Sequence, residues 1–67
     1  MKIHRQNVYP NLSRQFKNQG ELAKVIFRTD RSVRRRLSGR VAFEEFEIQR
    51  IEEYTGLSRE YLLRRAN

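Results

Sequence analysis

Arginine side chains gather between residues 28 and 40 at a density found nowhere else in the chain. Arg31 and Arg35 stand four positions apart, and Arg34 and Arg36 flank the second of them. A guanidinium carries a rigid fork of N–H donors, which matches the oxygens of a phosphate or the O6/N7 edge of a guanine. This stretch therefore has the chemistry of a surface that binds a polyanion.

The alternative interpretation is a solvated helix face that binds nothing. Solvated faces usually place an acidic residue at i,i+4 from a basic one, because such pairs stabilise a helix. Asp30 is the only acidic residue between Lys24 and Arg40. Like charges on one turn repel each other unless a polyanion meets them, so the uncompensated charge favours a binding surface.

A short helix over residues 30–37 would hold these arginines in fixed directions. Thr29 is a good N-cap, and the aspartate that follows it suits the positive end of the helix dipole. Gly39 provides a C-terminal stop. Val33 and Leu37 are the only large apolar side chains of this helix, so it can bury one narrow stripe.

The helical angles divide the arginines into two groups. At about 100° per residue, Arg31 and Arg35 point away from the buried stripe. Arg34 and Arg36 lie about 80° to either side of that stripe, one on each flank. In a major groove, outward side chains meet base edges and flanking cations meet phosphates. We therefore expect Arg31 and Arg35 to contact bases, and Arg34 and Arg36 to contact the DNA backbone.

Two short helices are predicted ahead of the arginine stretch. Pro10 suits the first turn of one helix, whose buried residues would be Leu12 and Phe16. Asn18 is the expected N-cap of the other, with Glu21 as its capping-box partner. The apolar stripe of this second helix consists of Leu22, Ala23, Val25 and Ile26.

Two more helices are predicted after the arginine stretch. One spans about residues 44–54 and stops at Gly56, with glutamates in its first turn that suit the helix dipole. Its apolar side chains are Phe46, Ile48, Ile51 and Tyr54. The last helix begins at Ser58, with Leu57 and Leu62 as a hydrophobic staple around that N-cap.

Composition fits one small domain over residues 1–67, of which 37% are hydrophobic and 34% charged. No window of four to eight residues both alternates apolar and polar residues and is rich in valine, isoleucine and threonine, as a strand is. We therefore predict an all-α fold, a compact bundle of about five short helices. Residues 1–8 could be a basic arm or an added strand. Without cysteine, and with His4 as the only histidine, we expect no metal site, cofactor or triad. No stretch approaches the ~18 apolar residues of a membrane span or resembles a signal peptide, so we expect a cytoplasmic protein.

Charge divides the chain into two unequal parts. The net charge is +7; residues 1–43 hold eleven basic and two acidic residues, a net +9, and residues 44–67 hold four and six, a net −2. This polarity indicates an oriented contact with a polyanion. The glutamates at 44, 45, 47, 52 and 53 are interpreted as helix-dipole partners on a solvated face. We expect no enzyme and no small-molecule substrate, because no nucleophile or pocket accompanies them.

Several short runs together resemble a known DNA-binding family. The run Asn18-Gln19-Gly20-Glu21-Leu22-Ala23, followed by Thr29, Ser32-Val33 and Leu37-Ser38-Gly39, resembles the helix-turn-helix of phage lambda-type repressors and Cro, the xenobiotic-response-element family. Glu60-Tyr61-Leu62 after Gly56-Leu57-Ser58 resembles the end of the same domain. The resemblance covers about residues 9–63.

The resemblance implies roles for the matching residues. Gln19 would contact a phosphate and brace the recognition helix, and Ala23 would let two helices cross closely. The implied base contacts are Asp30, Arg31, Ser32 and Arg35. Together with the helical angles, the expected backbone contacts are Gln19, Thr29, Arg34, Arg36, Ser38, Gly39 and Arg40. The first helix and its connection are shorter than in the usual pattern of the family.

Phe27 departs from this family, which usually has a glycine in the turn. A phenylalanine at positive φ would be strained, so we expect either a differently built turn or a Phe27 that packs into the core.

These features predict sequence-specific binding to double-stranded DNA by a small transcriptional regulator of phage or mobile-element type, near the nucleoid of a bacterial or phage-infected cell. A homodimer on a palindromic site would add contact area. Tyr61, Leu62 and Leu63 are its expected interface, with simple core packing as the alternative for these three residues.

Two other functions stay open. One is a protein-binding inhibitor that uses the cationic helix or the acidic helix of the same fold. The other is an RNA-binding module, but RNA readers usually offer exposed stacking aromatics. The four phenylalanines all fall at expected core positions, which argues against RNA: Phe16, Phe27, Phe43 and Phe46.

Overall fold

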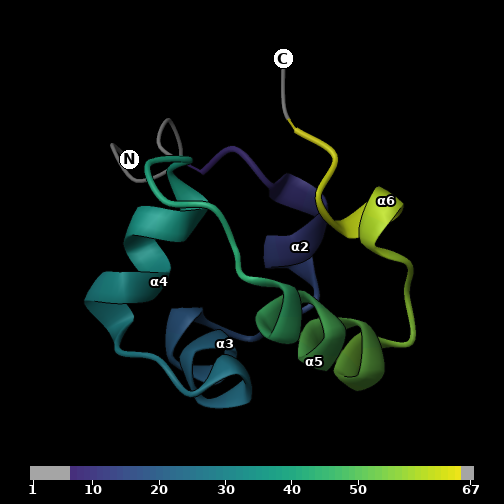
Figure 1. Ribbon diagram of the computed structural model, residues 1–67, viewed down its shortest axis with the longest axis horizontal. Coiled ribbons are helices and arrows are strands. Elements are labelled where there is room, and N and C mark those ends of the chain that lie inside the picture. Colours follow the sequence, from purple (N-terminus) through teal and green to yellow (C-terminus); the bar gives the residue numbers. More distant parts are fainter. Residues whose placement is uncertain (1–6, 66–67) are drawn as a thin grey trace.

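Five short helices make up the computed structural model, which describes residues 7–65 (Figure 1). In chain order they are α2 (Pro10–Arg14), α3 (Gln19–Ile26), α4 (Asp30–Leu37), α5 (Glu45–Thr55) and α6 (Arg59–Leu62). No strand occurs within residues 7–65, and the predicted all-α fold class is confirmed. Most of the predicted arm, residues 1–6, lies outside the described residues. In the described part of the chain, no helix has the length and apolar character needed to cross a membrane.

The helix starts follow from local hydrogen bonds. Asn18, Thr29 and Ser58 each accept a hydrogen bond from a backbone N–H in the first turn of the helix that they precede. These three predicted N-caps are therefore confirmed. Pro10 stands in the first turn of α2, where its missing N–H costs no hydrogen bond. The predicted capping box differs in one hydrogen bond. The Glu21 carboxylate accepts from the backbone N–H of Lys17, the residue before the N-cap, and not from that of Asn18.

The core is one cluster to which every helix contributes. Helix α3 packs on both α4 and α5, and α2 packs on α6. The buried apolar side chains are Leu12, Phe16, Leu22, Ala23, Ile26, Val33, Phe43, Ile51 and Leu62. Burial of one side of α4 in this cluster leaves its opposite side at the surface.

Phe27 takes a position that neither sequence alternative predicts. It ends α3 in the left-handed region, at φ +59° and ψ +45°, and 68% of the residue is exposed. The chain reversal requires this conformation, because it lets the backbone N–H groups of Phe27 and Arg28 bond to carbonyl groups in the last turn of α3. The phenyl ring lies outside the core, with the Arg50 guanidinium carbon 4.2 Å from its centroid.

Phe46 is the second phenylalanine outside the core. It is 43% exposed on α5, and the Arg28 guanidinium carbon lies 5.5 Å from its ring centroid. The prediction that all four phenylalanines are core residues is therefore wrong for Phe27 and Phe46. The reason is that each ring packs on a guanidinium, which covers an aromatic face without burying it.

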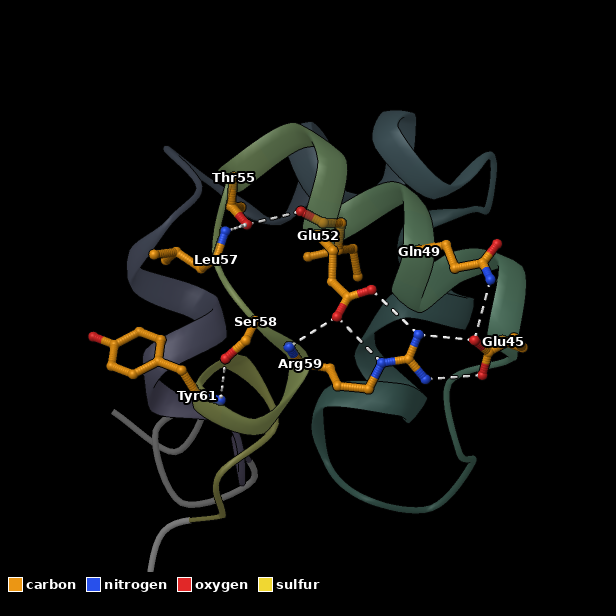
Figure 2. Close-up of polar contacts among 9 residues, drawn as sticks. Glu45, Gln49, Glu52, Thr55, Leu57, Ser58, Arg59 and Tyr61 are labelled. Atoms are coloured by element: carbon orange, nitrogen blue, oxygen red, sulfur yellow. Dashed lines mark hydrogen bonds and ion pairs between the residues drawn. The ribbon is translucent and has the colours of Figure 1, made fainter.

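An arginine between two carboxylates holds α6 against α5. Figure 2 shows Arg59 between Glu45 and Glu52, and its guanidinium donates hydrogen bonds to both. These bonds raise the pKa of Arg59 and lower the pKa of both carboxyls. Glu45 and Glu52 are thus ion-pair partners as well as members of an acidic face.

The three residues predicted as a dimer interface differ in how far the structure buries them. Leu62 is only 1% exposed and belongs to the core, so the core-packing alternative is confirmed for it. Leu63 is partly buried against the same core. Tyr61 is 38% exposed and keeps an accessible ring.

Candidate nucleic-acid interface

The outward side of α4 carries a surface hollow surrounded by positive charge. Its lining residues are Arg31, Arg34, Arg35, Ser38 and Arg40. All four of these arginines are exposed. We call this set the α4 surface. It brings together residues predicted to contact bases and residues predicted to contact the DNA backbone.

The arginines of the α4 surface have no protein partner within residues 7–65. None of their guanidinium groups forms an ion pair or a hydrogen bond with another described residue. In contrast, Arg28, Arg36 and Arg59 each pair with at least one glutamate. The positive charge of the α4 surface is therefore available to an external anion.

Helix α4 is fixed at its start and along its inner side. The Gln19 side-chain amide donates a hydrogen bond to the Asp30 carbonyl at 3.0 Å, which ties the start of α3 to the start of α4. This is the bracing expected of Gln19. Val33 is fully buried, and Ala23 on α3 is 5% exposed. These contacts hold the α4 surface on a rigid element, as precise recognition requires.

Arg36 differs from its predicted position. It is 6% exposed, and its Nε donates a hydrogen bond to Glu47 Oε1 at 2.9 Å. Its Nη1 donates to the hydroxyl and the carbonyl of Ser32. The prediction of an exposed flanking cation is wrong, because a carboxylate at the start of α5 lies within reach of the long side chain. Arg36 is therefore not part of the α4 surface.

Glu47 joins three parts of the fold through one buried carboxylate. It accepts hydrogen bonds from Arg36 on α4, from Arg28 in the turn after α3, and from the Glu44 backbone N–H. Burial alone would raise the pKa of Glu47, but the hydrogen bonds from Glu44, Arg28 and Arg36 outweigh it and hold that pKa below its ordinary value. The interpretation of Glu47 as a solvated residue is wrong, since its side chain is 0% exposed.

The other predicted site residues lie at the two ends of α4. Asp30 and Thr29 are exposed at its start. Ser32 is half-buried, and its hydroxyl is occupied by Arg36, so it faces inward more than expected. At the other end, Ser38 donates its hydroxyl hydrogen to the Arg35 carbonyl, and Gly39 has φ +86°.

Two lysines near α4 are missing from the predicted site. Lys17 and Lys24 are exposed and line a second hollow at the start of α3, together with Asn18, Gly20 and Glu21. A Cβ placed on Gly20 would lie 4.0 Å from Asp30 Oδ1, so this hollow adjoins the start of α4. No local pattern marks these lysines, because only the packing of α3 on α4 brings this hollow beside the start of α4.

Comparison of the chain with protein-family models, with curated proteins and with solved structures yields no match. What the α4 surface binds is therefore inferred from its own geometry and charge.

Proposed function

We propose that this protein binds double-stranded DNA, with α4 in the major groove, and acts as a small transcriptional regulator of the helix-turn-helix type. One observation carries the proposal. The exposed side of α4 presents Arg31, Arg34 and Arg35, and Arg40 follows in the turn after the helix. None of the four has a protein partner among the described residues, while the opposite side of α4 packs in the core. A helix inserted in a groove needs one side anchored and one side free.

The positions of the arginines suggest how the contacts divide. Arg31 and Arg35 follow one another by a single turn on the side opposite the buried stripe, so they face base edges. Each can form a bidentate pair with a guanine. Arg34 and Arg40 stand beside them and face the phosphates. Gln19 at the start of α3 adds a polar side chain near the DNA phosphates.

The resemblance to phage repressors supports the same proposal. It adds that two copies would bind a palindromic site, because one module of this size offers little contact area. Since Leu62 is in the core, a dimer contact on α6 would use the exposed ring of Tyr61.

The first experiment is selection of bound sequences from random duplex DNA, followed by titration of the selected duplex and a scrambled one. We expect one enriched sequence and a steep fall of log K with log salt, at about −0.9 per phosphate contact. No enrichment together with a salt slope near zero would contradict the proposal.

Variants of the outward arginines test the base contacts directly. Arg31→Ala and Arg35→Ala should each relax the preference at one or two positions of the selected site, with a loss of about 1–3 kcal/mol on that duplex. Arg14→Ala is the matched control, since Arg14 is exposed on α2 and lies outside the α4 surface. Equal losses on selected and scrambled DNA would exclude base reading by these two side chains.

A second candidate function is binding to a protein. It is favoured by Phe27, which is exposed in a strained conformation with Arg50 stacked on its ring. Aromatic and arginine side chains dominate the energetics of protein interfaces.

The exposed rings of Phe27 and Phe46 also bear on RNA binding, because the argument against an RNA ligand was that all phenylalanines lie in the core. Selection that enriches no duplex, alongside tight binding to single-stranded RNA or to a purified protein target, would favour these alternatives.

A further inference from the structure

Three separate segments meet at the C-terminal end of α4. The Val8 backbone N–H donates a hydrogen bond to the Leu37 carbonyl at 2.8 Å, so Val8, just before α2, lies against the last turn of α4. The segment after α6 returns to the same place. A Cβ built on Gly39 would lie 2.8 Å from Arg65 Nη2 and 3.5 Å from Val8 Cγ2. The Arg65 guanidinium is thus set beside the end of the α4 surface.

The Arg65 guanidinium contacts the aromatic ring of Tyr9. Its guanidinium carbon lies 5.5 Å from the centroid of Tyr9, and the Tyr9 ring packs on Phe43 with centroids 5.8 Å apart. Phe43 belongs to the core. Gly39 also adjoins the guanidinium, and a side chain at this position would force the Arg65 side chain to shift. A guanidinium that contacts a ring face in this way can still donate its N–H groups to a ligand.

The hydrogen-bond donors of Arg65 have no protein acceptor in the described part of the chain. Its side chain forms no ion pair and no hydrogen bond with residues 7–65, although Arg65 is exposed beside the end of a helix. The Leu37 carbonyl, a natural acceptor there, already receives the Val8 N–H. The guanidinium is therefore positioned but unused, which is how a preorganised anion contact is built.

We propose that Arg65 contacts a DNA phosphate and extends the α4 surface beyond the C-terminal end of α4. This inference rests on the proposed function. In helix-turn-helix proteins the start of the recognition helix reaches the base edges, so the opposite end lies near the sugar–phosphate backbone. A guanidinium at that end meets phosphate oxygens, which it binds as a fork. Arg65 then positions the protein on the duplex and does not read sequence.

The test compares Arg65→Ala with Arg64→Ala in salt titrations on selected and scrambled duplexes. Arg64 is the matched control, because it is exposed, carries the same charge one position away, and forms no side-chain hydrogen bond or ion pair within residues 7–65. Arg65→Ala should weaken binding to both duplexes alike and reduce the salt slope by about 0.9. Arg64→Ala should change the slope by less than half as much. Arg65→Lys should keep most of the slope, since a phosphate also accepts from an ammonium.

The failure of this inference is distinguishable from that of the proposed function. If the parent protein keeps a steep slope while Arg65→Ala and Arg64→Ala give equal slopes, Arg65 is not a phosphate contact, and DNA binding stands. If Arg65→Ala lowers the melting temperature but leaves the slope unchanged, Arg65 only stabilises the fold through Tyr9, which also overturns the inference. If the parent shows no salt-dependent binding, the proposed function itself fails.

Discussion

Arg34 and Arg36 stand on opposite flanks of α4, and within residues 7–65 only Arg34 keeps its guanidinium free for a ligand. Their different surroundings follow from one carboxylate. Glu47 lies at the start of α5, close enough to accept from Arg36 and from Arg28. Two residues of the same type, at the same angle from the buried stripe, therefore have different surroundings: Arg36 is buried in an ion pair, and Arg34 is exposed without one among the described residues.

Alanine variants of this pair should separate the two roles. Arg34→Ala should weaken binding to selected and scrambled DNA alike, with a salt slope lower by about one and a stability within about 0.5 kcal/mol of the parent. Arg36→Ala should lower the free energy of unfolding by about 3 kcal/mol, because it removes one partner from a buried charge. Urea unfolding and DNA titration measure both effects. An Arg36→Ala variant with parental stability would contradict the structural role of the ion pair.

At the scale of elements, the turn between α3 and α4 sets the direction in which the α4 surface points. Its geometry depends on a left-handed residue at the end of α3, and that residue is Phe27. A left-handed conformation costs an L-residue with a Cβ about 1–2 kcal/mol, which glycine does not pay. The cation–π contact between Arg50 and the exposed Phe27 ring offsets part of this cost, since such a contact at an exposed site contributes about 0.5–1 kcal/mol.

Two substitutions at Phe27 separate the cost of the left-handed backbone conformation from the contribution of the phenyl ring. Phe27→Ala and Phe27→Gly both remove the contact with Arg50, but only glycine relieves the left-handed conformation. The glycine variant should therefore unfold with a free energy about 1 kcal/mol higher than the alanine variant. Thermal and urea unfolding of the two variants provide the comparison. If the alanine variant is equally stable, the turn does not hold residue 27 at positive φ.

The helices could be predicted from the sequence because their boundaries depend on neighbouring residues. Thr29 caps α4 by accepting a hydrogen bond from the backbone N–H of Ser32, three residues later in the chain. Gly56 ends α5 with its own φ of +75°. The buried position of Arg36 could not be predicted in the same way. It depends on Glu47, which lies eleven residues further along the chain. The place of Arg65 depends on an even longer return of the chain, to Gly39 at the end of α4.

At the scale of the whole molecule, four of the glutamates in the second half of the chain pair with arginines that hold the helices together. Glu47 pairs with Arg28 and Arg36, whereas Glu45 and Glu52 pair with Arg59. The arginines of the α4 surface are left outside these networks. The arginines therefore form two groups: those that glutamates pair and that hold the fold together, and those of the α4 surface, whose uncompensated charge contributes to the net +7.

This division predicts how stability depends on pH. The pKa of Glu47 in the folded protein lies below its ordinary value of 4.5. The stabilisation from its ion pairs is therefore complete above about pH 4.5 and is lost as the pH falls through the lowered pKa, because the unfolded chain binds the proton first. Glu47→Gln should be less stable than the parent by about 3 kcal/mol at pH 7, since it leaves Arg36 buried without a carboxylate.

The difference between parent and Glu47→Gln should shrink as the solution is acidified below the lowered pKa, because the parent carboxylate is then protonated as well. Urea unfolding of both proteins at neutral pH, at mildly acidic pH and in strong acid measures this change. Glu53→Gln is the matched control, since Glu53 is exposed on α5 and forms no ion pair within residues 7–65. It should stay close to the parent throughout. A stability difference for Glu47→Gln that is the same at every pH would mean that shape and packing, and not the charge of the carboxylate, hold α4 against α5.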